Sequence, residues 1–509
     1  MALRSEMPGG LMAQALGSSK QSRPRAAGER TTIWDVIEDI GVGPWQLAAQ
    51  FMAGGILLAD GAEIQAIASV SDPIKQEWHL TDAQTGTLTS MIYVGVLVGG
   101  LGSGWVADVL GRRLPLIMAY AGLAVLAILS AAAPNFSMLL VLRTAFGVFV
   151  GIGGPAWNTM ASEITPSSWR MVIAGSSQIL FQFGVLYAIF NVWLNDPQMQ
   201  HINWRWQLVM SAIPSMICLL LSAFFLHESP AFLAANNRHD EALKVLDSMR
   251  RVNHRQDVSI GFDVAPPARS STGQGRGTAF GAQLGLIFSR RFRFTTLTLC
   301  YTYFTLNLVF YGNLYAFPQV LPAMQSTSGS GMPPTAQLAL GVITGGIPGV
   351  VMAATAGSML PRKLVIFMAM IFMGVSNILF SRPSDATHES SFSTFLIGYW
   401  GLRFGINFSF VIIWQYAAES YPTIVRATGC SVVFSVGRLG AILAPMLFEH
   451  LTRHGGNHCT YYMLCSVVCF VNCLFVPFWN ETLRQKMLED AGPEDEETEW
   501  ADPRTPLKP

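Results

Sequence analysis

Long apolar stretches recur along the chain at the length of membrane-spanning helices. Crossing a hydrocarbon core of about 30 Å takes roughly 20 apolar residues, because in lipid every backbone polar group must be satisfied within the helix. Such stretches fall near residues 45–69, 84–107, 114–133, 137–161, 171–194, 206–226, 294–317, 336–356, 364–380, 393–418, 428–449 and 460–479. The pattern predicts an all-α membrane protein with twelve transmembrane helices.

Composition supports lipid as the solvent. The 509 residues are 51% hydrophobic and 13% charged, whereas soluble proteins carry about 25% charged residues. The formal net charge is +0, so no overall field favours a nucleic-acid partner. Cys465, Cys469 and Cys473 repeat at helical spacing in an apolar run, which favours core packing over a metal or a disulfide. We expect no metal and no cofactor.

Basic residues predict the orientation, because Lys and Arg near span ends stay in the cytosol. Basic residues precede the first span and follow the second, fourth, eighth and tenth spans, so all of them fall on the same side of the membrane. They are Arg23, Arg25, Arg30, Arg112, Arg113, Arg170, Arg362, Lys363 and Arg426. Both termini are therefore expected in the cytosol, in the plasma membrane or an internal vesicle membrane.

One long connection divides the spans six to six. It opens with an amphipathic stretch at 239–251, whose Leu243, Leu246 and Met249 form one apolar stripe, and continues as a Pro-, Gly- and Ser-rich linker. The predicted organisation is a disordered cytosolic N-terminus at 1–32, a six-helix bundle at 33–227, a cytosolic linker at 228–293, a second bundle at 294–480 and an acidic tail at 481–509.

The two halves repeat a charged pattern, Glu-x-x-Pro-x-x-x-Arg, at the ends of the fourth and tenth spans. It runs from Glu163 to Arg170 and from Glu419 to Arg426, with Arg143 and Arg403 upstream. Charge pairs that form in one state and break in the other can bias a rocking equilibrium. We interpret these residues as gates; permanent ionic caps are the alternative.

The loop between the second and third spans reads Gly104-Trp-Val-Ala-Asp108-Val-Leu-Gly111-Arg112-Arg113. This pattern resembles the signature loop of the major facilitator superfamily. We expect Gly104 to permit close helix contact and Asp108 to form an ionic latch with the two arginines. The equivalent loop of the second half has Pro361 in place of the aspartate, which weakens the second latch.

Narrower motifs include Trp204-Arg205-Trp206, Glu228-Ser229-Pro230, Phe310-Tyr311-Gly312 and Arg426-Ala-Thr-Gly429. They are similar to motifs of the sugar-porter and organic-ion branch of that superfamily, nearest to synaptic-vesicle-2-related proteins and organic cation/anion transporters. The resemblance implies two pseudo-symmetric six-helix bundles and secondary transport of a small organic solute, with no enzymatic activity, in a monomer. A sugar porter is less favoured, because the seventh span of this chain lacks the Gln-Gln pair that is expected in sugar porters. A transport-fold sensor without turnover is a further alternative.

The first predicted span carries Asp60 and Glu63 on nearby faces. Charge inside a bilayer is costly, so both carboxylates should face the central cavity. We hypothesise that one or both take up a proton or contact a cationic group. A static polar pairing is the alternative.

Arg438 in the eleventh span is a cation without a partner nearby in sequence. In the transporters that the chain resembles, this position tends to be basic in anion carriers, which favours an organic anion. A guanidinium can grip a carboxylate with two parallel hydrogen bonds. Pairing with a carboxylate of the first span is equally open.

Polar and aromatic side chains within the spans complete the candidate site, since such groups need a partner or a wet cavity. Those taken as substrate contacts are Gln178, Gln182, Asn307, Tyr311, Trp414 and Gln415. Each could equally act as a contact between helices.

Overall fold

The computed structural model describes residues 31–263, 284–289, 292–328, 332–381, 389–421, 423–455 and 458–476. The predicted disordered N-terminus, the central part of the linker and the acidic tail lie outside these ranges. Within them the chain is helical and contains no strand.

The N-terminal half contains α2 (Ile33–Ile40), α3 (Pro44–Trp78), α4 (Asp82–Leu110), α5 (Arg113–Ala131), α6 (Phe136–Ile164), the short 3-10 turn η1 (Ser167–Trp169), α7 (Arg170–Asn195), α8 (Trp204–Phe225), α9 (Pro230–Ala235) and α10 (His239–Val252). The C-terminal half contains α12 (Arg293–Ser328), α13 (Pro334–Gly341), the π turn η2 (Val342–Gly346), α14 (Ile347–Met359), α15 (Arg362–Ser381), α16 (Glu389–Glu419), α17 (Thr423–Gly455) and α18 (Cys459–Phe475). Among the described residues, ten helices are long and apolar enough to cross a membrane. Helices α12 and α18 fill the other two positions of a twelve-span architecture.

Local sequence sets where several helices begin. The Asn135 side chain accepts a hydrogen bond from the Met138 amide, and Asn203 accepts one from Trp206, so each caps the first turn that follows it. At α2, Thr32 and Asp35 form a reciprocal capping box. These caps satisfy amides that would otherwise be unpaired near the bilayer surface.

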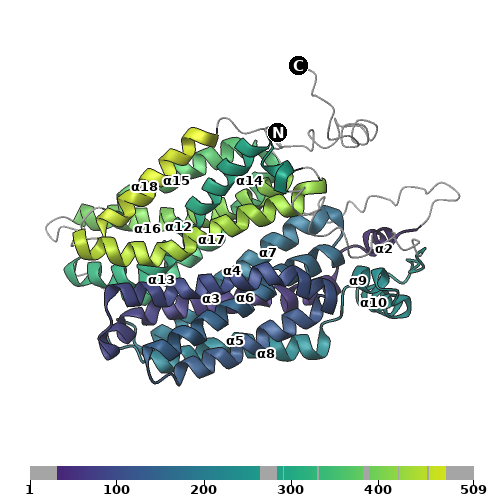
Figure 1. Ribbon diagram of the computed structural model, residues 1–509, viewed down its shortest axis with the longest axis horizontal. Helices are drawn as coiled ribbons and strands as arrows, with labels where there is room; N and C mark the ends of the chain where they lie inside the picture. The colour runs from purple at the N-terminus through teal and green to yellow at the C-terminus, as the bar shows by residue number, and fades with distance from the viewer. Residues whose placement is uncertain are drawn as a thin grey trace, which may run out of the picture.

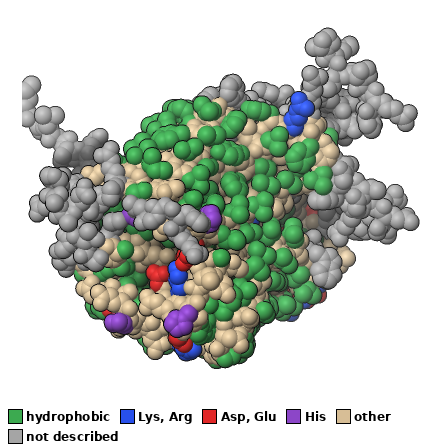
Figure 2. All heavy atoms as spheres, turned by 60° about the vertical axis from the view of Figure 1, so that its left-hand side comes forward, with side chains coloured by type: hydrophobic (Ala, Val, Ile, Leu, Met, Phe, Trp, Pro, Cys, Tyr) green, Lys and Arg blue, Asp and Glu red, His purple; other side chains and the backbone are tan. Residues whose placement is uncertain are grey.

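The spans pack as two six-helix bundles (Figure 1). Helices α3 to α8 form the N-terminal bundle and α12 to α18 form the C-terminal bundle, and the two meet along α4 with α17, α3 with α12, and α7 with α13 and α14. Close approach within a bundle depends on glycine: a Cβ at Gly95 of α4 would lie 2.1 Å from the Thr144 carbonyl oxygen of α6. Large apolar side chains face outward, as lipid requires, and cover broad areas of the surface in Figure 2.

Three short helices, α2, α9 and α10, gather at one end of the N-terminal bundle (Figure 1). We call this the linker end and the opposite end the far end. Helix α10 is the predicted amphipathic helix; it buries Leu246 and Met249, with Val245 and Ala242, while Leu243 is half-buried.

Candidate transport site

An arginine, an aspartate and two tyrosines meet where the bundles face each other. The Arg438 Nη1 atom of α17 donates to the Tyr311 hydroxyl of α12 at 2.7 Å, and the guanidinium lies 5.7 Å from that ring. From the other bundle, the Tyr93 ring of α4 packs 4.6 Å from the Tyr311 ring. Asp60 of α3 is buried and interacts electrostatically with Arg438. Four helices of two bundles therefore converge on one charged, aromatic cluster.

Close packing of α17 on α12 holds Arg438 in place. A Cβ at Gly440 would lie 2.3 Å from the Phe304 carbonyl oxygen, so only glycine allows this approach. Within the described residues, no ion pair joins Arg438 to a carboxylate. Its charge is stabilised by the Tyr311 hydroxyl, by the π face of that ring and by a longer-range attraction to Asp60.

A pair of side-chain amides joins the bundles beside this cluster. Gln182 of α7 donates to the Asn407 side-chain oxygen of α16 at 2.7 Å, and both residues are buried. They line a cavity of ≈ 10 Å³ together with Phe181, Phe310 and Arg403. That volume holds about one water molecule, so this cavity must widen before an organic solute enters it.

The two carboxylates of the first span have different partners. Glu63 points into the N-terminal bundle, where it accepts hydrogen bonds from Arg143 at 2.8 Å and from Ser211 at 2.7 Å. Both charged side chains are inaccessible, at 1% and 0% exposure. The expectation that both carboxylates face the central cavity is therefore wrong for Glu63, and Arg143 forms a buried pair inside one bundle.

The upstream arginine of the second half has different neighbours. The Arg403 guanidinium lies 4.9 Å from the Phe317 ring, and its Nε atom donates to the Tyr399 hydroxyl at 3.3 Å. Both side chains lie within the C-terminal bundle.

At the linker end, Arg112 of the predicted latch contacts a carboxylate of α6. Arg112 donates to Glu163 of α6 at 3.0 Å and stacks over Phe232, while Asp108 lies outside the described side chains. Gly111 adopts a φ of +89°, a conformation that favours glycine. A Cβ at Gly104 would meet no described atom within 4 Å, so the close contact expected there is not formed with the described part of the chain.

Sequence reasoning missed the role of Glu228. Its carboxylate accepts hydrogen bonds from the amides of Arg112, Arg113 and Ser229, so it caps the first turn of α5. The contact joins residues that are 115 positions apart in the sequence. Its one sequence signal was the presence of an acidic residue, Glu228, after α8.

Three of the remaining predicted residues contact neighbouring side chains or backbone. Arg170 lies over the Trp34 ring, Asn307 donates to the Tyr303 carbonyl of its own helix, and Trp414 stacks on Phe434. Gln178 is half-buried. The side chains of Gln415, Glu419 and Arg426 lie outside the described part of the chain.

Ion pairs close the far end between the bundles. Lys75 of α3 lies 2.7 Å from Asp82 in its own bundle and 3.6 Å from Glu449 of α17. Glu449 also accepts a hydrogen bond from Tyr315 of α12 at 2.6 Å. Charged side chains gather at this end, which Figure 2 brings forward.

Two lipid-embedded six-helix bundles with a polar site at their interface define a secondary transporter of the major facilitator class. Comparison with known proteins agrees: residues 49–490 match the family model described as "Sugar (and other) transporter". The chain belongs to that family and is a multi-pass membrane transporter rather than an enzyme.

Those relatives of the chain that are named for a solute are named for different ones. The chain is 28% identical to Organic cation/carnitine transporter 7 of Arabidopsis thaliana, over 88% of this chain and 94% of the relative. It is 26% identical to the Synaptic vesicle 2-related protein of Xenopus laevis (87% and 80%) and 28% identical to the gallate transporter of Pseudomonas putida (77% and 82%). The xylose transporter XylE from E. coli, in a partially occluded inward-open conformation, shares the fold with a TM-score of 0.69 at 15% identity, covering 86% of this chain and 99% of that one.

Proposed function

We propose that this transporter moves a small organic anion, a carboxylate, by alternating access. The observation that carries the proposal is Arg438, a cation at the interface that is bonded to the Tyr311 hydroxyl and not ion-paired to a carboxylate among the described residues. A substrate carboxylate can pair directly with this guanidinium through two parallel hydrogen bonds.

The surrounding rings favour a substrate that is itself flat and apolar on its faces. Tyr93 and Tyr311 pack against each other, and Phe310 lies 4.8 Å from Tyr311. Aromatic pairs gain about 0.5–1.5 kcal/mol beyond area burial. The relative named for gallate, an aromatic carboxylate, supports this choice of substrate class.

In this proposal, Asp60 couples the transport of the anion to the transport of a proton. A bound anion and an ionised Asp60 would place two negative charges around one guanidinium, and like charges in one site favour protonation of a carboxyl group. One proton then accompanies the anion. Gln182, Asn407 and Gln178 contact the polar groups of the substrate as the bridge between the bundles opens.

The linker end faces the cytosol in this proposal. It carries Arg112, Arg113, Arg170 and Arg362, and basic residues near span ends remain cytosolic. With twelve spans, both termini then lie in the cytosol, in a vesicle or plasma membrane, and each monomer contains a complete site.

Counterflow in proteoliposomes tests the function, because only a carrier exchanges labelled substrate across a sealed membrane. We expect exchange of labelled 4-hydroxybenzoate, with little exchange of xylose or carnitine. Arg438→Gln should lower the initial rate at least about 30-fold, since losing one member of a buried charge pair costs about 2–5 kcal/mol.

The matched control is Arg438→Lys, which keeps the charge and loses the fork of donors. It should retain more activity than Arg438→Gln. Equal exchange by Arg438→Gln and the parent protein would overturn the anion site. For the coupling, Asp60→Asn should abolish the dependence of uptake on an inward proton gradient, and a preserved dependence would exclude Asp60 as the proton site.

A further inference from the structure

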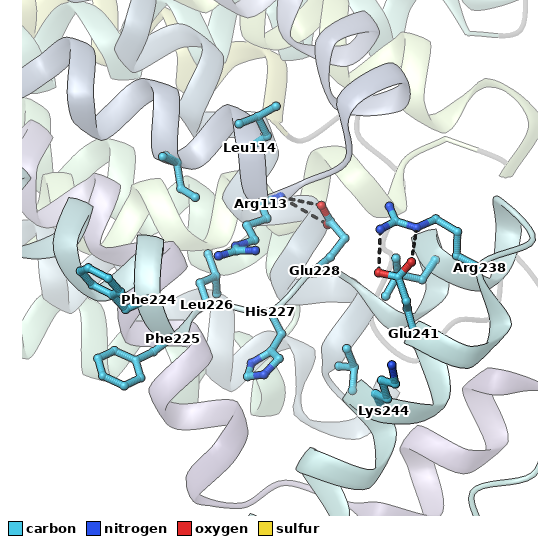
Figure 3. Close-up of a pocket in the computed structure, with 13 residues that line it drawn as sticks. Arg113, Leu114, Phe224, Phe225, Leu226, His227, Glu228, Arg238, Glu241 and Lys244 are labelled. Carbon is cyan, nitrogen blue, oxygen red and sulfur yellow. Dashed lines mark hydrogen bonds and ion pairs between the residues drawn. The ribbon is translucent and has the colours of Figure 1, made fainter.

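A second cavity lies at the linker end, away from the transport site. It measures ≈ 580 Å³ and is walled by the start of α5, the end of α8 and the helices α9 and α10 (Figure 3). That volume lies in the range of small-molecule sites. The proposed transport cycle does not use it.

The charges that line this cavity are unevenly matched. Glu228 is satisfied by backbone amides, and Glu241 is held by Arg238 through both carboxylate oxygens, at 2.8 and 2.6 Å (Figure 3). Arg113 and Lys244 form no ion pair within the described residues. The cavity therefore keeps an excess of positive charge.

Arg113 is fixed in place with part of its guanidinium unsatisfied. Its Nη2 atom donates to the Ala223 carbonyl oxygen at 2.8 Å, which anchors the side chain against the end of α8. Its buried Nε atom has no hydrogen-bond partner in the described structure. Because this guanidinium lines the cavity and is ion-paired to no described carboxylate, its positive charge favours an anionic ligand with several acceptor oxygens.

His227 lies beside this guanidinium. Partial burial and the positive charge of Arg113 lower the pKa of His227 below its usual value of 6.5. The imidazole is therefore neutral at pH 7 and can donate or accept a hydrogen bond without adding charge.

The opposite wall of the cavity is apolar and open to the bilayer. Phe224 and Phe225 end the membrane span α8 with 77% and 62% exposure, and Leu114 begins the span α5 with 44% exposure. Ile117 continues the same face of α5 one turn further into the membrane. A ligand in this cavity therefore meets cations on one side and hydrocarbon on the other.

We propose that this cavity binds the headgroup of an anionic phospholipid. The phosphate lies between Arg113 and Lys244, and the acyl chains run along Leu114, Phe224 and Phe225 into the bilayer. The amphiphilic lining separates this ligand from a soluble phosphate compound, which would leave the apolar wall exposed to water. Basic pockets beside transmembrane helices suit such headgroups. The lipid then ties α10 to the ends of α5 and α8.

The test measures binding to the purified full-length protein in neutral detergent, by thermal unfolding during titration with dioctanoyl phosphatidylglycerol. We expect saturable stabilisation by this lipid. Dioctanoyl phosphatidylcholine and inorganic phosphate, titrated over the same range, should give little. Equal stabilisation by phosphatidylcholine would overturn the role of charge, and equal stabilisation by inorganic phosphate would overturn the lipid as ligand.

Two variants locate the site. Lys244→Gln removes an exposed ammonium that no described hydrogen bond uses, so the fold is retained, and the apparent affinity should fall about fivefold. Adding Arg113→Gln should weaken binding by about a further fivefold. The control is Arg251→Gln, on the same helix but outside the cavity lining and paired with Asp247 at 2.6 Å, which should leave affinity unchanged. Loss of affinity in Arg251→Gln equal to that in Lys244→Gln would show general surface attraction and overturn the site.

Discussion

The two bundles hold equivalent arginines in different ways. In the N-terminal bundle, Arg143 of α6 is neutralised by Glu63 and inaccessible. In the C-terminal bundle, Arg403 of α16 rests against Phe317 and the Tyr399 hydroxyl, and Arg438 bonds to Tyr311. One bundle thus satisfies its buried cation internally with a carboxylate, whereas the other surrounds two cations with aromatic rings. Within the described part of the chain, only the second arrangement leaves cations without an ion-paired carboxylate.

Arg143→Met should produce the largest effect on stability. The substitution leaves the Glu63 carboxylate buried with Ser211 as its remaining hydrogen-bond partner among the described residues, and breaking a buried pair costs about 3–5 kcal/mol. We expect a large fall in the free energy of unfolding in detergent. Because Arg143→Met with Glu63→Leu removes both charges, the double variant should recover much of the loss. A double variant no more stable than Arg143→Met would contradict an ionic pair.

Arg403→Met should be milder, which tests the comparison directly. No carboxylate is left uncompensated within the described residues, and the lost contact with the Phe317 ring is worth about 0.5–2 kcal/mol. The same unfolding assay should give a destabilisation well below that of Arg143→Met. A fall in the free energy of unfolding as large as that of Arg143→Met would show that Arg403 also neutralises a buried negative charge.

Arg205→Gln should have the smallest effect. Arg205 pairs with Glu77 at 2.8 Å at the far end, but both side chains are more than 40% exposed. Exposed pairs contribute about 0–1 kcal/mol, and salt screens them. The unfolding midpoint should shift little at moderate ionic strength. A shift near that of Arg143→Met would mean that exposure does not separate the two kinds of pair.

Hydropathy predicted the spans well, because lipid imposes a length and a composition on each helix separately. The first span was expected at 45–69 and forms part of α3, which continues to Trp78. The eighth was expected as one helix at 336–356, but a π turn at Val342–Gly346 divides it. Hydropathy averages over many residues and does not register a single wide turn.

The candidate site was less predictable, because its contacts join distant helices. Asp60 and Arg438 were found as costly charges, but Glu63 and Arg143 are 80 residues apart and their pairing depends on how α3 and α6 pack. Likewise, Glu163 was expected to act with Arg170, and it bonds to Arg112 across 51 residues. A sequence identifies which groups need partners, whereas packing decides which partners they receive.

The ion pairs at the far end have one further consequence. Lys75 bonds to Asp82 within its own bundle and to Glu449 across the interface, while Glu449 also holds the Tyr315 hydroxyl of its own bundle. In the proposed alternating-access cycle, separation of the bundles at this end leaves Lys75 paired with Asp82 and Glu449 hydrogen-bonded to Tyr315. Neither charge would then be left buried without a polar partner. The Lys75–Glu449 ion pair can therefore break and re-form without a large electrostatic barrier.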